Sequence, residues 1–221
     1  DNVILEASSH GLKQHRLDGL NFTTAIFTNL SHDHLDYHKN FKDYLNAKLY
    51  LFKKLLKKKT NIITDITIPE YKKIKKISQK NKLCLETIGK DKGDLIIVKH
   101  GYQDEKQIVK IKYNNNIYSF KVNLIGKIQI KNIVMAMLAA EKSNINFKKI
   151  VNVINKIKPV NGRLEKIGML KNNAKVILDY AHTPDALKSC LQSLRDQFKN
   201  SKISIVFGCG GDRDKSKRPK M

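Results

Sequence analysis

Short apolar runs alternate with helix-spaced apolar positions along the first 157 residues. Val3–Glu6 and Ala25–Asn29 are apolar runs that end in polar clusters, which is typical of buried parallel strands whose carboxyl ends carry a site. The apolar spacing predicts a helix over residues 40–57. Further strands are predicted at 61–64, 83–87, 95–98, 108–113 and 117–122, and helices at 131–142 and 146–157. The "NNN" between the last two strands predicts a hairpin.

A second unit is predicted after the stretch "KPVNGR". Its pattern predicts a strand at Lys175–Asp179, a helix at Pro184–Phe198 and a strand at Ser201–Phe207, followed by the loop "GCGGDRDKSKR". Because Pro and Gly interrupt regular structure, the boundary is placed at Pro159–Gly162. The sequence therefore predicts an α/β protein with domains at 1–158 and 159–221.

Composition narrows the class of protein. A chain of 221 residues with 41% hydrophobic content can form one large domain or two smaller ones with cores. We find neither a secretory signal nor an apolar run of about 18–20 residues, so a cytoplasmic protein without membrane spans is expected. The three cysteines, Cys84, Cys190 and Cys209, have no disulfide or metal spacing and are expected to be reduced. The start on Asp1 and the end at "KRPKM" suggest a segment of a longer chain.

The net charge of +23 raises the possibility of a nucleic-acid partner, since lysine and arginine neutralise phosphates. The lysines are spread through every segment, including "FKKLLKKKT" and "YKKIKKISQKNK". Aromatic residues do not interleave with them, as a base-stacking surface would require. We therefore expect solvated helix faces and no nucleic-acid partner.

Two polar clusters follow predicted strands and carry the candidate chemistry. Glu6 closes the first strand, and "NLSHDHLDYH" at 29–38 follows the second with three histidines and two aspartates. Carboxylate and imidazole at neighbouring strand ends favour a divalent metal, and the oxygen-rich surroundings favour magnesium over zinc. The alternative is that these residues only cap loops and helices.

Three separated motifs resemble the Mur ligase family. The run "EASSHGLKQHRLDGLNFTTAIFTNLSHDHLDYHKNFKDYLNAKLYLF" is similar to the family's central domain, and "DYAHTPDAL" and "VFGCGGDRDKSKRP" are similar to its C-terminal domain. The resemblance implies the later part of a P-loop-type ATPase central domain, followed by the start of a Rossmann-like C-terminal domain. The P-loop pattern GxxxxGK[ST] is absent from the 221 residues, so the segment alone is expected to be inactive.

The resemblance also implies a reaction. Members with the "SSHGLKQHR" type of motif add the third peptide residue, diaminopimelate or lysine, to UDP-MurNAc-L-Ala-D-Glu through an acyl phosphate. ATP and Mg²⁺ would be required, and a monomer is expected. The alternatives are a related Mur or folylpolyglutamate-type ligase with another acceptor, which this motif argues against, and a basic nucleic-acid-binding module.

The resemblance assigns roles to individual residues. Glu6 and His34 would bind magnesium, and Lys48 would join them as a carbamate, an anionic oxygen ligand; the alternative for Lys48 is an ordinary surface lysine. Candidate substrate contacts are Ser8, Gln14 and Arg16 for the UDP-MurNAc-dipeptide and Arg213 for the incoming amino acid; candidate nucleotide contacts are Asn132, Arg163, Asp179 and His182. Ile128 and Gln129 depart from the family's usual aromatic and asparagine. His10 and His15 are expected to be structural.

Overall fold

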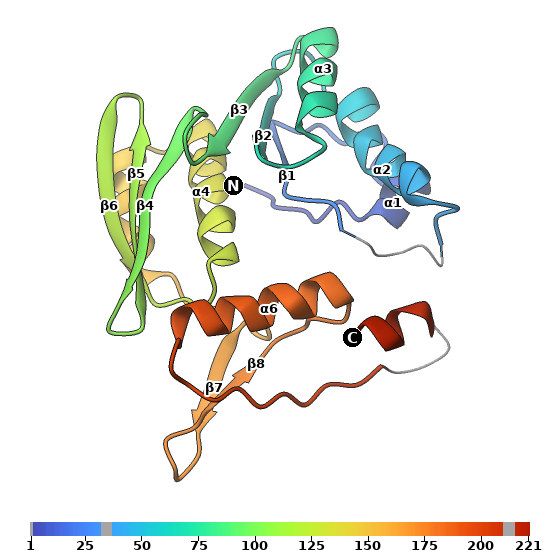
Figure 1. Cartoon of the computed structure of the whole chain (residues 1–221). Coiled ribbons are helices and arrows are strands. Elements are labelled where there is room, and N and C mark those ends of the chain that lie inside the picture. The colour runs from blue at the N-terminus through green and yellow to red at the C-terminus, as the bar shows by residue number, and fades with distance from the viewer. Residues whose placement is uncertain (1, 32–36, 210–214) are drawn as a thin grey trace. The chain divides into compact units, whose positions relative to one another are not determined.

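The computed structural model describes residues 2–31, 37–209 and 215–221. The chain divides into two compact units, Asp1–Thr87 and Ile88–Met221 (Figure 1). Helices and strands alternate in the first unit, and the second unit joins an antiparallel meander to helices and a further strand pair. This mixture confirms the predicted α/β fold class. Within the described ranges, no helix is both long and apolar enough to cross a membrane.

The first unit is built around two parallel strands. β1 pairs with β2 in parallel, from Thr24 opposite Asn61 to Phe27 opposite Thr64. Parallel neighbours need a long crossover, and here it contains α2 and a short π-helix. The elements in chain order are α1 (Ser9–Lys13), β1 (Thr24–Phe27), α2 (Phe41–Tyr50), the π-helix (Leu51–Leu55), β2 (Asn61–Asp65), α3 (Tyr71–Asn81) and β3 (Cys84–Gly89), which ends in the second unit.

The core of the first unit lies between these strands and helices. β2 is buried at four successive positions, as expected for a strand covered on both faces. The rings of Phe27 on β1 and Phe52 in the π-helix lie 5.9 Å apart. The buried cluster includes Leu12, Ala25, Phe27, Leu45, Leu49, Phe52, Ile62 and Ile74.

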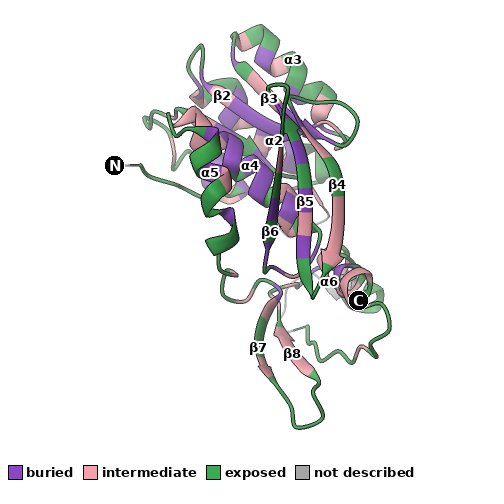
Figure 2. Ribbon diagram, turned by 90° about the vertical axis from the view of Figure 1, so that its left-hand side faces the viewer, coloured by how far each residue is buried: buried purple, intermediate pink, exposed green. Residues whose placement is uncertain are grey.

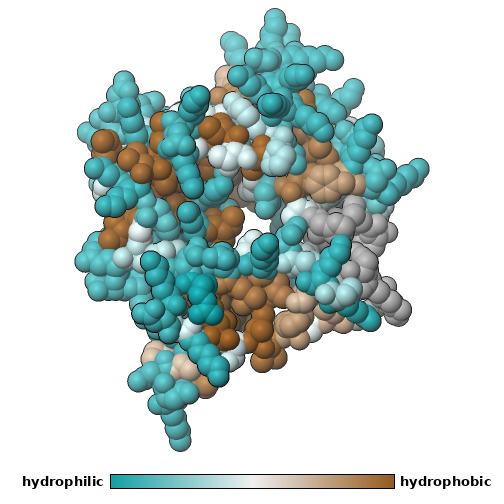
Figure 3. All heavy atoms as spheres, viewed as in Figure 1, coloured by the Kyte–Doolittle hydropathy of each residue, from teal (hydrophilic) through white to brown (hydrophobic). Residues whose placement is uncertain are grey.

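Local sequence explains where the helices of the first unit begin and end. Asn40 caps α2, because its Oδ1 accepts a hydrogen bond from the Asp43 backbone N–H at 2.9 Å. At the end of α3, the Asn81 side chain donates to the carbonyls of Phe52 and Lys53, both at 3.1 Å, which satisfies carbonyls that a helix end leaves open. The lysines of α3 point to solvent, and Figure 3 shows hydrophilic side chains over this helix.

The second unit opens with an antiparallel meander. The last two residues of β3 pair in parallel with β4 (Leu95–Gln103), which is followed by β5 (Lys106–Tyr113) and β6 (Asn116–Val122). Both hairpin turns have two successive residues with positive φ, Asp104–Glu105 and Asn114–Asn115, as tight type I′ turns require. Figure 2 shows buried and exposed residues alternating along β5.

Two helices cover this meander. Phe147, the first residue of α5, lies with its ring 4.5 Å from that of Tyr113 and 5.1 Å from that of Tyr118. The remaining elements are α4 (Ile128–Lys142), α5 (Phe147–Val153), a 3₁₀ turn (Ile154–Lys156), the antiparallel pair β7 (Glu165–Met169) and β8 (Lys175–Leu178), α6 (Pro184–Gln197) and a 3₁₀ helix (Lys215–Lys220).

A buried glutamine fixes the loop that leads into α4. Gln107 is fully buried, and its Nε2 donates to the carbonyls of Leu124 at 2.8 Å and Gly126 at 3.1 Å. Its Oε1 lies 2.7 Å from Nε2 of His100.

Gly126 has a φ of +91°, and an added Cβ would lie 2.5 Å from Cδ1 of Leu164. The Gly126 N–H donates to Oε1 of Gln197 at 3.0 Å. Glycine is therefore required at 126 both for backbone conformation and for space.

Two predicted strands are wrong. Residues 2–8 and 202–209 have no regular secondary structure, although Val3–Glu6 and Ser201–Phe207 have the composition of strands. A strand is stabilised by a hydrogen-bonded neighbour and a buried face, and these segments have neither among the described residues. Val3 is 92% exposed and Ile4 98%, and Val206 is also fully exposed. High β-propensity alone does not make these segments strands.

Candidate active site

The helix α1 carries two of the predicted substrate-binding residues at its ends. Ser8 caps the helix, because its Oγ accepts a hydrogen bond from the Gly11 N–H at 3.1 Å. The hydroxyl proton of Ser8 is then available for an acceptor outside the helix. At the other end, Nε2 of Gln14 donates to the Tyr37 hydroxyl at 3.1 Å. Arg16 follows in the next turn with an exposed side chain. The three polar side chains therefore lie along one short helix and its exit.

Lys48 lies near the end of α2 and differs from the surface lysines of α3. Its Nζ is 5.4 Å from the ring centroid of Tyr44, which is buried one turn earlier on the same helix. Lys48 itself is half-buried. A cation over an aromatic face is stabilised by the ring quadrupole, so this ring holds the Lys48 amine in place.

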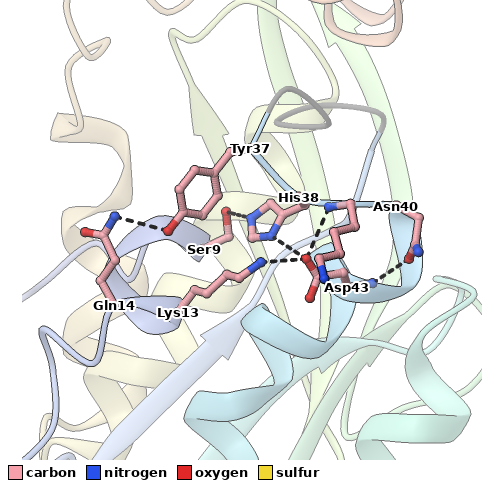
Figure 4. A network of polar contacts seen from close by, with 8 residues as sticks. Ser9, Lys13, Gln14, Tyr37, His38, Asn40 and Asp43 are labelled. Atoms are coloured by element: carbon pink, nitrogen blue, oxygen red, sulfur yellow. Dashed lines mark hydrogen bonds and ion pairs between the residues drawn. The ribbon is translucent and has the colours of Figure 1, made fainter.

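Asp43 on α2 links this helix to α1. Its Oδ2 accepts a hydrogen bond from Nζ of Lys13 at 2.6 Å and from the Lys39 N–H at 3.3 Å (Figure 4). The hydrogen bond from Lys13 lowers the pKa of the Asp43 carboxyl. An ionised Asp43 therefore accepts from both helix α1 and the segment that precedes α2.

His38 lies buried between the same two helices, with 1% of its surface exposed. Its Nε2 is 3.0 Å from Oγ of Ser9, and its Nδ1 is 3.5 Å from Oδ2 of Asp43. The imidazole is stacked against the ring of Tyr44 with centroids 5.1 Å apart. Burial is the main cause of a lowered His38 pKa, and the charge of Lys13 lowers it further, while Asp43 opposes the shift. The sequence analysis assigned no role to Ser9, His38 or Asp43.

His10 in α1 and His15 at its exit both contact neighbouring side chains. The ring of His10 lies 3.9 Å from that of Tyr37. His15 has a φ of +59°, and its Nδ1 lies 3.1 Å from Oδ2 of Asp18 and 2.9 Å from the hydroxyl of Tyr50. The hydroxyl of Tyr50 also donates to Asp18 at 2.9 Å. His15 therefore helps to hold the turn that follows α1.

The predicted magnesium ligands are Glu6, His34 and Lys48, and the structure describes Glu6 and Lys48. Glu6 is exposed on an extended segment, and its carboxylate is the hard oxygen ligand that Mg²⁺ prefers. His34 lies outside the described residues. Among the described residues no group of three or more His, Cys, Asp or Glu side chains gathers at one point. An ammonium at Lys48 would repel the ion, so the donors fit Mg²⁺ if Lys48 carries a carbamate.

In the second unit, Arg163 and His182 approach the same tyrosine. The Arg163 guanidinium carbon lies 4.9 Å from the ring centroid of Tyr180, a cation–π distance. Nδ1 of His182 is 3.0 Å from the carbonyl of Tyr180, and the two rings lie 5.1 Å apart. Tyr180 is 64% exposed. Two of the predicted nucleotide-binding residues therefore flank an exposed aromatic ring.

Asp179 is held by backbone donors. Its Oδ2 accepts from the Leu164 N–H and its Oδ1 from the Ala181 N–H, both at 2.8 Å. Burial raises the pKa of the nearby Cys190 thiol to about 11, and the charge of Asp179 adds to this shift. A protonated thiol at neutral pH agrees with the predicted structural role of Cys190.

Asn132 lies apart from these residues in α4. Its side chain is exposed, and its Nδ2 donates to Oε1 of Gln129 at 3.4 Å in the same helix. Arg213, predicted to bind the incoming amino acid, lies outside the described residues. The structure thus brings Ser8 and Gln14 onto one helix, and Arg163 and His182 onto one tyrosine, but it does not describe His34 or Arg213.

Comparison with known proteins identifies the family. A model of the Mur ligase middle domain matches residues 1–140, and a model named "Mur ligase, glutamate ligase domain" matches residues 162–221. The chain belongs to the Mur ligase family. These matches cover the three motifs from which the resemblance was drawn, so the predicted family is confirmed.

Relatives within the Mur ligase family align over the whole chain. A UDP-N-acetylmuramoyl-L-alanyl-D-glutamate–2,6-diaminopimelate ligase of Rickettsia bellii (strain RML369-C) is 39% identical over 222 residues, covering 100% of this chain and 46% of the relative. The corresponding ligase of Agrobacterium fabrum (strain C58 / ATCC 33970) is 37% identical, covering 100% of this chain and 45% of the relative. The chain therefore spans about half the length of the curated relatives it matches.

Solved structures show the same fold. A structure of a UDP-N-acetylmuramoyl-L-alanyl-D-glutamate–2,6-diaminopimelate ligase superposes with a TM-score of 0.72 at 31% identity, covering 97% of this chain and 44% of that chain. This neighbour and the two domain models agree with the predicted Mur ligase central and C-terminal domains and with a mixed α/β fold.

Proposed function

We propose that the full-length protein containing these 221 residues is an ATP-dependent amide ligase. It would add diaminopimelate to UDP-MurNAc-L-Ala-D-Glu in peptidoglycan synthesis. The observation that carries this proposal is the alignment of the whole chain, at 39% identity, with a ligase named for that reaction. Lysine is the alternative third residue. We further propose that the enzyme acts in the cytoplasm as a monomer, with domains at 1–158 and 159–221.

The arrangement of α1 supports binding of the UDP-MurNAc-dipeptide by Ser8, Gln14 and Arg16. The substrate carries phosphates and carboxylates, which are recognised by hydroxyl and amide donors and by the forked guanidinium of arginine. Ser8 keeps a hydroxyl proton to donate, and Arg16 is exposed. Gln14 is pre-positioned by Tyr37, because the hydrogen bond between them fixes one of its two amide hydrogens.

Glu6, His34 and Lys48 are proposed to hold Mg²⁺ beside the ATP γ-phosphate. When bound, the ion would offset the negative charge of the phosphates. The amine of Lys48 must first react with carbon dioxide, forming an N–C bond and releasing a proton, to become an anionic carbamate. The half-buried position of Lys48 supports this role, since it limits the space open to the side chain.

Asn132, Arg163, Asp179 and His182 are proposed to contact the nucleotide, and Arg213 the carboxylate of the incoming amino acid. The exposed ring of Tyr180, with a guanidinium over it, presents the surface on which a base can stack. Asp179 uses both oxygens on backbone N–H groups. These two hydrogen bonds also fix the chain between Arg163 and His182.

The proposed reaction has two steps. A terminal carboxylate oxygen of the dipeptide attacks the γ-phosphorus of ATP, and ADP leaves. The amine nitrogen of the incoming residue then attacks the acyl carbon, phosphate leaves, and the nitrogen loses its extra proton. Charge builds on the transferred phosphoryl group and then on the acyl oxygen, so fixed cations and N–H donors accelerate both steps.

A coupled assay tests the proposal. The full-length protein is incubated with ATP, Mg²⁺ and UDP-MurNAc-L-Ala-D-Glu, with either diaminopimelate or lysine. Phosphate release is measured, and the mass of the nucleotide-linked product is determined by mass spectrometry. We expect phosphate release to require the dipeptide and the amino acid together, with diaminopimelate preferred. The assignment would be refuted if phosphate is released at the same rate without the dipeptide. It would also be refuted if no product forms with either amino acid.

A further inference from the structure

We propose that His38 is a positioning residue that fixes the substrate-binding helix α1 against α2, the helix that carries Lys48. The inference rests on the proposed function and extends it to a residue for which the sequence analysis gave no role. His38 acts through Ser9 on one side and through Tyr44 on the other, and it does not itself contact substrate.

The burial of His38 places it between the two helices. Nε2 lies 3.0 Å from Oγ of Ser9, the first residue of α1, and Ser9 is itself only 2% exposed. On the other side, the imidazole stacks on Tyr44 of α2 at 5.1 Å. Figure 4 shows His38 and Lys13 converging on the carboxylate of Asp43. One imidazole therefore contacts both helices directly.

The partners of His38 define which nitrogen carries the proton. Asp43 is ionised and can only accept, so Nδ1–H faces its Oδ2 across 3.5 Å. Nε2 is then unprotonated and accepts a hydrogen bond from the Ser9 hydroxyl. Other groups that face His38 are Lys13 and His10, whose ring lies 5.7 Å away, together with the rings of Tyr37 and Tyr44. The neutral imidazole fits this set of neighbours.

Each helix that His38 contacts leads to a proposed active-site residue. Ser9 follows Ser8, the capping residue proposed to bind substrate. The ring of Tyr44, which stacks on His38, also lies 5.4 Å from Nζ of Lys48. Without the imidazole, the Ser9 hydroxyl would lose its acceptor and Tyr44 would lose its stacking partner. The distance between the dipeptide site and Lys48 would then be less well defined, and small misplacements are costly in catalysis.

A nucleophilic triad of Ser9, His38 and Asp43 is excluded by the burial of its members. The order of the three side chains resembles that of serine hydrolases. A nucleophile must reach the substrate, however, and Ser9 is 2% exposed within a helix while His38 is 1% exposed. The separation of 3.5 Å between His38 and Asp43 is also long for a hydrogen bond. The cluster is therefore suited to hold two helices together and not to attack a substrate.

Three substitutions at His38 in the full-length protein test the inference. His38→Ala removes both contacts, His38→Gln places an amide where Nε2 lies, and His38→Asn places one where Nδ1 lies. We expect His38→Ala to raise KM for the UDP-MurNAc-dipeptide at least fivefold, with KM for ATP changed less than twofold. Gln should restore most of the loss and Asn little, because the contact with Ser9 depends on the Nε2 position.

A matched control separates positioning from general destabilisation. His100→Ala in the second unit removes a part-buried histidine that also has one short side-chain contact, at 2.7 Å to Gln107. The inference is overturned if His100→Ala raises the dipeptide KM as much as His38→Ala does at equal loss of Tm. It is also overturned if His38→Ala leaves that KM within twofold of wild type.

Hydrogen exchange keeps the inference separate from the proposed function. In His38→Ala the amides of α1 should exchange at least tenfold faster than in wild type, while those of α6 should be unchanged. A wild-type protein without ligase activity would refute the proposed function, and the exchange of α1 would then decide alone whether His38 joins the two helices. Unchanged exchange in α1 would overturn the inference.

Discussion

Two buried polar clusters within the described ranges, one in each unit, are organised differently. In the first unit His38 contacts side chains, Ser9 and Tyr44, that belong to two helices. In the second unit Gln107 donates to two backbone carbonyls of the loop before α4, those of Leu124 and Gly126. Both central residues have at most 1% of their surface exposed, so water does not reach their polar atoms.

The difference indicates different roles. Side-chain contacts between helices set the relative position of the functional groups that those helices carry. Contacts to backbone carbonyls instead fix the path of one loop, whatever side chains it carries. We therefore expect changes around His38 to alter substrate kinetics, and changes around Gln107 to alter stability. The predictions below test this division, beginning with the largest effect.

Lys48→Ala should abolish most ligase activity of the full-length protein. The magnesium site would lose its proposed anionic ligand, and we expect a roughly 1000-fold fall in kcat, in the range seen for loss of a charge-stabilising group. Added bicarbonate should not restore activity, whereas small carboxylates are expected to restore part of it. Lys53→Ala, at an exposed lysine of the following π-helix, is the control and should leave turnover unchanged. Wild-type turnover of Lys48→Ala at limiting Mg²⁺ would show the carbamate assignment to be wrong.

Gly126→Ala should destabilise the second unit by about 3 kcal/mol, from backbone strain and overpacking together. The residue has a φ of +91°, and the new Cβ would lie 2.5 Å from the buried Leu164. Gly162→Ala is the matched control, because Gly162 has a φ of +68° but no atom within 4 Å of an added Cβ. Urea unfolding should give a clearly smaller loss for Gly162→Ala. Equal losses would mean that the contact with Leu164 contributes nothing.

Most of the regular structure could be predicted from the sequence where residue type and spacing agreed. β2, β5 and β6 combine β-branched residues with clear boundaries, and α6 begins with a capping Thr183 followed by Pro184. The two wrong strands lie where long-range pairing decides the outcome, and the helices α1 and α3 were not predicted. Val3–Glu6 and Ser201–Phe207 have strand composition but no described partner. β7 (Glu165–Met169) was missed because its charged and small residues show no alternation.

The candidate site could be predicted only as far as local motifs define it. Three motifs carried the resemblance to the family, and the roles of Glu6, Lys48 and Arg16 followed from it. The role of His38 depends on its packing between α1 and α2. Its contact with Ser9 joins two residues that are 29 positions apart in the sequence. In "HDHLDYH" nothing local distinguishes the buried histidine from its neighbours. Tertiary contacts of this kind require the structure.

Arg16→Ala should raise KM for the UDP-MurNAc-dipeptide roughly 30-fold. This corresponds to a loss of about 2 kcal/mol of binding free energy, the contribution of one charge-assisted hydrogen bond. KM for ATP should change less than twofold, because Arg16 follows the helix assigned to the dipeptide. Arg195→Ala is the control: Arg195 donates to the carbonyl of Ser201 and has no proposed contact with substrate. Equal effects on both substrates would contradict the role given to Arg16 and weaken the division between the two clusters.

The smallest expected effect is a pH dependence of stability that originates at His38. Burial and the charge of Lys13 lower the His38 pKa in the folded state, below the value of about 6.5 of an unfolded chain. The unfolded state then binds more protons, so the stabilising contribution of the neutral imidazole is complete above about pH 6.5. It is lost as the pH falls toward the folded pKa, by at most about 1.4 kcal/mol per pH unit.

The stability difference between wild type and His38→Gln isolates this contribution, because glutamine does not titrate. Measured by urea unfolding of the full-length protein, the difference should shrink between pH 7.5 and pH 5.5. Lys13→Met removes the charge that adds to the shift, so in that background the loss should be smaller. A difference that stays constant over the whole range would mean that His38 has the same pKa in both states. His38 would then contribute to stability by packing only, as we expect for the residues around Gln107.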